Sequence, residues 1–483
     1  MDSRLIFEKS KEGRQGYKHP ELKVDKISLD SVIDREFLRP SHPDLPQVTE
    51  NEVARHYTNL SSKNHHVDKD FYPLGSCTMK YNPKINEYIA SMQEFLLAHP
   101  SQDESTIQGA LEIIHRLERY LIDITGMSRA TLQPVAGSQG EFVGLLIMRA
   151  YHEKKGSTKK TILIPETAHG TNPASVILAG YEVVQLKSDA RGRIDIDDLK
   201  EKISDDTAGL MLTQPNTLGL FEDQIEQIST LVHSVDGLMY MDGANLNALV
   251  GYVKPSDMGF DIVHINLHKT FSTPHGGGGP GAGPIAVVDK LVGFLPSPMI
   301  NNDSGRFFQD YDMPDSIGRV HFCNGNFGIL VRAYSYIRTL GRNGLLAMTK
   351  NAILNANYLK RKLEKKYLVP YSDGTMHEFV LSASSQKDRG VKALDIAKSL
   401  LDYGFHPPTI YFPMNIPEAM MIEPTESESL ETLDRFGDAM LEIDQEIDND
   451  KEKILNAPYT TPVRRLDETG ANRNLDIRWK DEV

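Results

Sequence analysis

Six short apolar runs, separated by segments with helical periodicity, constrain the fold of this chain more than any other feature. Each run has the length of a strand and ends in polar or small residues. Strands that alternate with helices are typical of a mostly parallel sheet covered by helices on both faces. The sequence therefore predicts an α/β fold, with strands at residues 161–164, 181–186, 209–213, 238–242, 262–267 and 284–288.

This alternation occupies the middle of a chain of 483 residues and divides it into three regions. Residues 1–95 are rich in proline, histidine and charge, and we expect them to form an arm that wraps a partner subunit. Residues 96–340 form the predicted large domain. Residues 341–483 form a predicted smaller α+β domain, with helices at 344–367, 390–403 and 427–449 and strands at 378–382 and 409–412.

A lysine follows the fifth apolar run and precedes a glycine-rich loop. Lys269 lies just after the run 262–267, and four consecutive glycines begin at Gly276. A desolvated amine has a lowered pKa and can form a Schiff base with an aldehyde. Glycine lets the backbone approach a ligand closely. The alternative interpretation is a solvated surface lysine.

The preceding run ends in an aspartate, Asp242. Strands of an α/β sheet present their carboxyl ends to a common crevice, so Asp242 and Lys269 are expected to converge there. Pyridoxal 5'-phosphate (PLP) requires this pair, because the lysine binds its aldehyde and the carboxylate keeps its pyridine nitrogen protonated. Taken alone, Asp242 also fits a helix N-cap or a turn.

Small residues lead into a predicted helix at 137–148. Gly137, Ser138 and Gln139 would place backbone N–H groups and a hydroxyl where the helix dipole favours an anion. They are candidates to hold the cofactor phosphate, and the alternative is an ordinary loop and cap.

Several polar residues at the ends of other strands are further candidates. His169 follows the first strand, where an imidazole can stack on a flat cofactor ring or move a proton, or make only structural hydrogen bonds. Thr213, Asn216 and His268 lie at neighbouring strand ends and are weaker candidates for cofactor or substrate contact.

The chain resembles the glycine cleavage system P-protein, the PLP-dependent glycine dehydrogenase (decarboxylating), and in particular the second subunit of its split form. The matching blocks follow one another from the N-terminal region to the tail, so the resemblance spans nearly the whole chain. They are residues 72–84, 133–140, 169–175, 215–222, 267–271, 274–284, 316–319, 421–426 and 462–467. Residues 406–408 depart from the family pattern, and Ser272 occupies a variable position.

The resemblance implies a fold of the aspartate-aminotransferase type (fold type I), in which a large and a small domain clamp PLP. It implies that Lys269 binds PLP covalently, Asp242 pairs with the pyridine nitrogen, His169 stacks on the ring, and the 137–139 turn holds the phosphate. Lys269, His169 and His268 are the candidate proton carriers.

The resemblance also implies a reaction and its partners. Glycine would lose its carboxylate as CO2, and the aminomethyl group would pass to the lipoyl arm of the H-protein. Because the family's first subunit lacks the lysine, this chain would be the catalytic half of an α2β2 assembly; the alternative is a homodimer. The residue that binds the glycine carboxylate stays open among Arg319, Arg464 and Arg465, each of which also fits a structural ion pair.

Two other functions fit part of this pattern. A different PLP enzyme on the same fold, such as an aminotransferase or a C–S lyase, would use the same lysine and aspartate. A noncatalytic assembly subunit would keep the fold, but the intact Lys269, Asp242 and phosphate turn argue against it. The chain has no P-loop string.

The segment 72–84 is unusual because Pro73, Gly75 and Pro83 exclude a regular helix. We interpret it as an ordered loop that reaches an active site, its own or that of a neighbouring subunit. The alternative is a plain connector.

Composition excludes several classes of function and location. The net charge of −14 argues against nucleic-acid binding. Two cysteines, Cys77 and Cys323, favour a reducing compartment over a disulfide framework. The sequence shows no signal peptide and no apolar run long enough to span a bilayer, and it predicts no metal site. We therefore expect a cytoplasmic protein that does not associate with membranes.

Overall fold

The computed structural model describes residues 4–276 and 281–479, so the glycines at 277–279 lie outside the described residues. The chain forms two compact units. One consists of Met1–His65 with Pro462–Val483, and the other of His66–Thr461. The larger unit contains every predicted site residue except Arg464 and Arg465.

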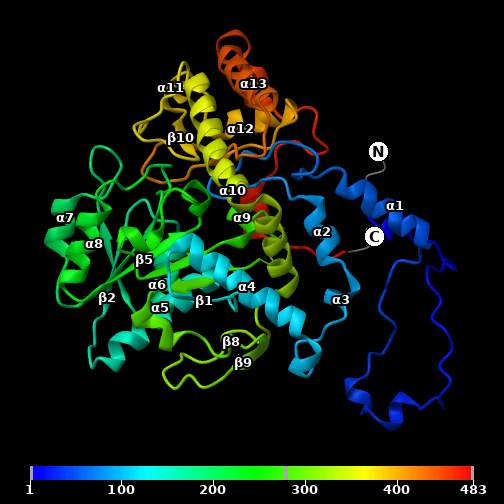
Figure 1. The fold of residues 1–483 in the computed structure, drawn as a ribbon. Coiled ribbons are helices and arrows are strands. Elements are labelled where there is room, and N and C mark those ends of the chain that lie inside the picture. Colours follow the sequence, from blue (N-terminus) through cyan, green and yellow to red (C-terminus); the bar gives the residue numbers. More distant parts are fainter. Residues whose placement is uncertain (1–3, 277–280, 480–483) are drawn as a thin grey trace. The chain divides into compact units, whose positions relative to one another are not determined.

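A seven-stranded sheet with the order β1-β7-β6-β5-β4-β2-β3 lies at the centre of the larger unit (Figure 1). The strands β6, β5, β4, β2 and β3 are parallel, and β7 runs antiparallel to β6 and to β1. The α/β prediction and its six strands are confirmed. The strands are β1 (Arg129–Thr131), β2 (Thr161–Pro165), β3 (Glu182–Leu186), β4 (Thr207–Thr213), β5 (Leu238–Gly243), β6 (Ile262–Ile265) and β7 (Ile285–Val287).

The strand sequences are continuous apolar runs because both faces of the sheet are buried. In β4, Leu210 and Leu212 face one core with helices α4 and α8, and Ala208 and Met211 face another with α5 and α6. The sheet therefore has helices on both sides, as predicted. The helices of this part are α4 (Gln108–Thr125), α5 (Gly137–Lys154), α6 (Thr171–Leu178), α7 (Ile196–Lys202) and α8 (Ile225–Ser234).

A long helix, α10 (Phe327–Leu363), is interrupted at Gly341, whose φ of 58° and ψ of −172° are not helical. The helix predicted at 344–367 is its second segment. Two short helices, α2 (Lys84–Ala90) and α3 (Gln93–Leu96), and a hairpin of β8 (Met299–Asp303) and β9 (Arg306–Asp310), complete this part of the unit.

A second, antiparallel sheet with the order β10-β12-β11 packs with the end of α10 around a separate core (Figure 1). The predicted α+β character of this region is thus confirmed, although β12 was not among the predicted strands. The division into domains at residue 340 stays a prediction. The elements are β10 (Phe379–Ser382), α11 (Ser384–Asp388), α12 (Ala393–Asp402), β11 (Thr409–Ile410), β12 (Ala419–Ile422), α13 (Leu430–Asn449) and α14 (Lys451–Asn456).

The smaller unit contains two α-helices, α1 (Glu50–Ser61) and α15 (Glu468–Arg473). A capping box between Thr49 and Glu52 begins α1. Within residues 4–65, Val48 is the one residue that is buried. Such a segment lacks a core of its own, and its predicted role as a partner-wrapping arm stays a prediction. Among the helices described for either unit, none combines the length and apolar character needed to cross a membrane.

Candidate active site

Lys269 lies on α9 (Leu267–Thr270), a single helical turn that follows β6. The turn explains why β6 ends earlier than predicted. The half-buried Lys269 Nζ donates a hydrogen bond to the carbonyl oxygen of Ser76 at 2.7 Å. Ser76 belongs to the segment 72–84, which we call the strap. The strap therefore contacts the candidate catalytic lysine of its own chain.

The strap is attached to β12 through its backbone. Leu74 forms a β-bridge with Ile422, and the N–H of Gly75 donates to the carbonyl of Met421 at 3.2 Å. A Cβ atom on Gly75 would lie 2.6 Å from that carbonyl oxygen, which explains the glycine. This attachment fixes the strap on the small sheet while its next residues reach Lys269.

Asp242 is the penultimate residue of β5 and is 2% exposed. Its Oδ1 lies 3.1 Å from His264 Nε2 and accepts the N–H of Ala244, and its Oδ2 accepts the Asn172 amide at 3.0 Å. Burial alone would raise the pKa of Asp242, but His264, Asn172, Ala244 and Lys269 together lower it below its usual value. The site thus holds an ionised carboxylate inside the protein.

His264 is itself fixed from the other side. Its Nδ1 lies 3.1 Å from the Tyr240 hydroxyl, which donates to the carbonyl of Gly140 on α5 at 3.3 Å. The imidazole is 1% exposed, so its orientation toward Asp242 is set by protein groups alone.

The anion site predicted from the sequence lies at the first turn of α5, where its role stays a prediction. Gly137 begins the helix after Ala136, and first-turn N–H groups have no acceptor within a helix. A Cβ on Gly137 would lie 2.7 Å from Asn266 Oδ1, an oxygen with no partner among the described residues. A Cβ on Gly283 would lie 2.1 Å from the carbonyl of Ala136. Close packing of the 281–284 loop therefore positions this helix end, and Ser138 is exposed on it.

Three predicted cofactor contacts have different surroundings. The side chain of Gln139 is occupied by two hydrogen bonds, accepting from the N–H of Val135 and donating to the carbonyl of Val320. Its backbone N–H is therefore the group available to a phosphate. Asn216 is occupied by its own turn, since its Oδ1 accepts two backbone N–H groups and its Nδ2 donates to Gly192. Thr213 Oγ1 is buried without a partner among the described residues. Their contact with a cofactor stays a prediction.

His169 remains open to solvent beyond β2. Its Nδ1 lies 2.8 Å from Thr171 Oγ1, and its ring centroid lies 5.8 Å from that of Phe412. Desolvation by neighbouring atoms, together with the charge of Lys269, lowers the pKa of His169. A neutral imidazole with an accessible face can stack on an aromatic ring.

His268 is more enclosed than His169. Burial, the neighbouring His275 and Lys269 lower the pKa of His268 to about 3. Burial and Lys269 lower the pKa of His275 to about 4. The two rings lie 4.9 Å apart, and His268 Nδ1 has no partner in the part of the chain that is described. Both imidazoles are therefore neutral at neutral pH.

Of the three candidate arginines, Arg319 belongs to the same unit as Lys269. Arg319 donates to the Tyr311 hydroxyl at 3.0 Å and to the carbonyl of Phe322 at 3.3 Å. Arg464 and Arg465 belong to the smaller unit. The partner of the glycine carboxylate stays open.

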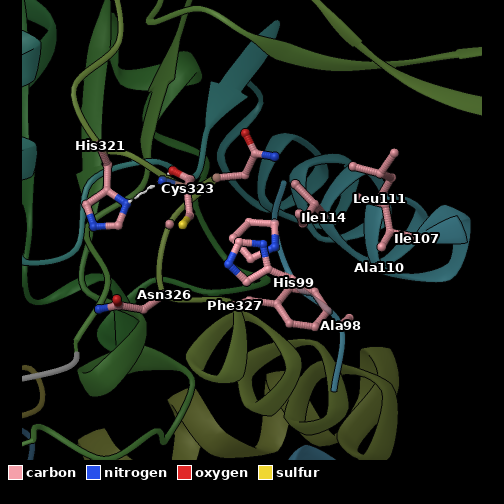
Figure 2. A pocket seen from close by; sticks show the side chains of 13 residues that line it. Ala98, His99, Ile107, Ala110, Leu111, Ile114, His321, Cys323, Asn326 and Phe327 are labelled. Atoms are coloured by element: carbon pink, nitrogen blue, oxygen red, sulfur yellow. Dashed lines mark hydrogen bonds between the residues drawn. The ribbon is translucent and has the colours of Figure 1, made fainter. Parts of the chain in front are cut away.

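A separate cavity of about 260 Å³ has an apolar wall of Leu111, Ile114 and Phe327 (Figure 2). His321 and Cys323 form its polar side, where the Cys323 N–H donates to His321 Nδ1 at 3.3 Å. None of the predicted site residues lines this cavity. It is therefore distinct from the site at Lys269.

The residues around Lys269 fit PLP. They supply an amine, a buried ionised carboxylate, a helix N-terminus with free donors and an accessible neutral imidazole. In the same order, these groups suit the aldehyde, the pyridine nitrogen, the phosphate and the aromatic ring of PLP.

Comparison with known families agrees with this chemistry. Residues 25–305 match the model of the glycine cleavage system P-protein, and residues 348–461 match that of the glycine dehydrogenase C-terminal domain. The chain belongs to the glycine cleavage system P-protein family.

Curated relatives of the family match over their full length. A protein of Chloroherpeton thalassium named probable glycine dehydrogenase (decarboxylating) subunit 2 is 55% identical over 483 residues, covering 99% of this chain and 98% of its own. A Bacillus licheniformis protein of the same name is 55% identical over 481 residues, covering 99% of each. The family resemblance seen in the sequence is thus confirmed.

Solved structures show the fold. An inhibitor-bound glycine decarboxylase (P-protein) superposes with a TM-score of 0.73 at 19% identity, covering 86% of this chain and 95% of that one. Glutamate decarboxylase of Lactobacillus brevis gives a TM-score of 0.66 at 14% identity, covering 87% and 97%. The chain has the fold of PLP-dependent enzymes of fold type I, as the sequence predicted.

Sequence reasoning missed several residues that surround Lys269 and Asp242. They are His264, Asn172 and two glutamates, Glu378 and Glu423, which flank strands of the small sheet. A signal was present, because a charged or polar residue inside or beside an apolar strand is rarely buried without a function or a partner.

Proposed function

We propose that this chain is the PLP-binding, catalytic subunit of a two-subunit glycine dehydrogenase that decarboxylates glycine and passes the aminomethyl group to the lipoyl arm of an H-protein. The observation that carries the proposal is that Lys269 lies close enough to Asp242 to lower its pKa, while Asn266, three residues before Lys269, packs against Gly137 at the N-terminus of α5, in a chain of this family.

We assign the cofactor contacts by the chemistry of each group. Lys269 would bind the aldehyde, Asp242 the pyridine nitrogen, and the N–H groups of residues 137–139 with the Ser138 hydroxyl the phosphate. His169 would stack on the ring. When bound, PLP supplies an electron-withdrawing ring that stabilises negative charge on the substrate carbon after the carboxylate leaves.

The protein's own groups would carry out positioning and proton transfer. The Asp242 carboxylate, held by His264 and Asn172, favours a positive charge opposite it. Lys269 Nζ, with the Ser76 carbonyl as its acceptor, can hold and release a proton at the substrate. His268, with a pKa of about 3, is too weak a base to carry protons efficiently, so we assign proton transfer to Lys269 and His169.

We further propose a homologous first subunit as partner, in an α2β2 assembly in the cytoplasm. The names of the relatives, which are second subunits, support such a partner. The exposed 4–65 segment supports an extended contact. The free thiols of Cys77 and Cys323 suit a reducing compartment.

Borohydride reduction of the full-length chain with PLP, followed by peptide mass mapping, tests the cofactor assignment with and without the first subunit. We expect a pyridoxyl adduct on Lys269, none in Lys269→Met, and an unchanged adduct in Lys254→Met, a control at an exposed lysine. An adduct elsewhere, with Lys269 unmodified, would refute the assignment.

The reaction is tested separately. Carboxyl-labelled glycine should release labelled CO2 when the first subunit and lipoylated H-protein are present. Transamination of glycine without CO2 release would instead identify a different PLP enzyme on this fold.

A further inference from the structure

Two fully buried glutamates lie opposite each other beside the candidate catalytic lysine. Glu378 directly precedes β10 and Glu423 directly follows β12, and the antiparallel pairing of Phe379 with Ile422 places the two glutamates face to face. Both side chains are 0% exposed. We call them the glutamate pair. One carboxylate oxygen of each and a ring nitrogen of His377 lie within 4.8 Å of one another.

The glutamate pair holds the strap at the two residues on either side of Cys77. Glu378 accepts the backbone N–H of Ser76 at 2.7 Å. Glu423 accepts the N–H of Thr78 at 2.9 Å and its hydroxyl at 2.7 Å. The carbonyl of Ser76 accepts a hydrogen bond from Lys269 Nζ. The residue whose N–H is bound by Glu378 therefore also contacts the lysine.

The backbone at these two strap residues is strained. Ser76 has a φ of 64° and Thr78 a φ of 49°, in the left-handed region that side chains disfavour. For a β-branched residue such as Thr78 this conformation is rare, and it persists only where surrounding contacts impose it. The hydrogen bonds to the glutamate pair are among the contacts that hold the backbone here.

The loop after Asp242 also reaches the pair. The Asn245 amide lies 3.3 Å from Glu378 Oε1, and the Asn247 amide lies 3.4 Å from Glu423 Oε1. Five N–H and O–H donors therefore surround the pair, an arrangement that suits carboxyl oxygens better than it suits a bound cation. The pair thus joins the strap, the small sheet and the β5 loop at one point.

His377 points at the pair without bonding to it. Its Nε2 lies 3.6 Å from Glu378 Oε1 and 4.0 Å from Glu423 Oε1, and neither ring nitrogen has a hydrogen-bond partner among the described residues. The side chain is 0% exposed. Such a buried ring with no partner indicates that the polar cluster serves a purpose beyond packing.

The charges around the pair require a proton. Burial, and then Lys269, lower the pKa of His377 to about 3, and burial raises the pKa of Cys77, so both are neutral. Glu426, the other acid facing the pair, is bound by Lys80 at 2.7 Å. Lys269 is the cation whose charge acts on both glutamates, and it acts on Asp242 as well. Burial raises the pKa of both glutamates, and repulsion from Glu423 raises that of Glu378 further.

We propose that Glu378 and Glu423 share one proton, and that the pair positions the Ser76 carbonyl and supplies a single balancing negative charge at Lys269. The pair keeps the strained strap turn in place through its hydrogen bonds. Its one remaining charge stabilises the ammonium form of Lys269 whenever that amine is free. The importance of this arrangement for catalysis rests on the proposed function, whereas its charge and geometry do not.

Competitive acetylation of the full-length chain without cofactor tests the inference, with the labelling of Lys269 read by mass spectrometry against exposed lysines in the same digest. Glu378→Gln and Glu423→Gln each mimic a protonated carboxyl and leave one ionised, so each should label Lys269 within about twofold of wild type. The double variant loses the balancing charge, and its Lys269 should react roughly tenfold faster at neutral pH, as a one-unit change in a protonation equilibrium produces.

Two outcomes overturn the inference. If each single variant already accelerates labelling clearly and the double variant accelerates it further, both glutamates are ionised in the wild type and no proton is shared. If the double variant labels like wild type, the pair does not act on Lys269.

Infrared spectroscopy gives a measurement that needs no double variant: wild type should show the C=O stretch of a buried protonated carboxyl at neutral pH, and its absence refutes the shared proton. Neither readout involves glycine or PLP, so failure here leaves the decarboxylase proposal standing, and the reverse also holds.

Discussion

Lys80 on the strap forms a buried ion pair whose disruption we expect to destabilise the larger unit strongly. Its side chain is 1% exposed, and its Nζ contacts Glu426 Oε1 at 2.7 Å and the carbonyl of Thr270 at 2.9 Å. Burial alone would lower the pKa of Lys80, but the charge of Glu426 raises it overall. Lys80 therefore stays protonated inside the protein.

Lys80→Met removes the cation and leaves Glu426 buried. Its Oε1 would keep only the Tyr336 hydroxyl at 3.2 Å, and its Oε2 already has no partner among the described residues. Breaking a buried pair by removing one partner costs about 3–5 kcal/mol, because an uncompensated charge remains. Replacing both residues, as in Lys80→Met with Glu426→Met, should restore much of this loss, since two apolar side chains need no counter-charge.

Urea denaturation followed by circular dichroism measures these free energies. Fluorescence is unsuitable because the single tryptophan, Trp479, lies in the smaller unit. Lys84→Met is the matched control on the same strap. Lys84 pairs with Asp68 at 2.5 Å, but their side chains are 58% and 42% exposed, so its loss should cost less than about 1 kcal/mol. The reasoning is refuted if Lys80→Met costs no more than Lys84→Met, or if the double variant loses the sum of both single losses.

Two further predictions concern a buried acid and a close backbone contact. Burial raises the pKa of Glu428 to about 7, above its unfolded value, so its contribution to stability is present in acid and is lost as the pH rises through about 7. Glu428→Gln should therefore gain up to about 3 kcal/mol over wild type in alkaline urea denaturation and nothing in acid, and an equal gain at both pH values would contradict this. Gly283→Ala places a Cβ 2.1 Å from the carbonyl of Ala136 and should displace the N-terminus of α5. Its affinity for PLP, titrated by absorbance, should fall on the order of tenfold or more, and an unchanged affinity would show that this helix end does not hold the phosphate.

The positions of Lys269 and Asp242 at the sheet edge could be predicted from the sequence because the relevant signals are local. An apolar run of strand length identifies a strand, and the carboxyl ends of parallel strands share one edge. The same reasoning predicted six of the seven strands of the large sheet, but neither β1 nor the antiparallel direction of β7. Strand direction depends on the path of residues 267–284, which no local pattern determines.

The sequence by itself determined the α/β alternation, the lysine, the aspartate and the glycine-rich approach to α5, each of which depends on neighbours along the chain. Only the tertiary structure decided what surrounds them. Glu378 and Glu423 meet because β10 pairs antiparallel with β12, and the strap reaches Lys269 because its backbone joins the same sheet. Such contacts join residues far apart in the chain, and their energies depend on distance and burial, quantities that do not exist until the chain has folded.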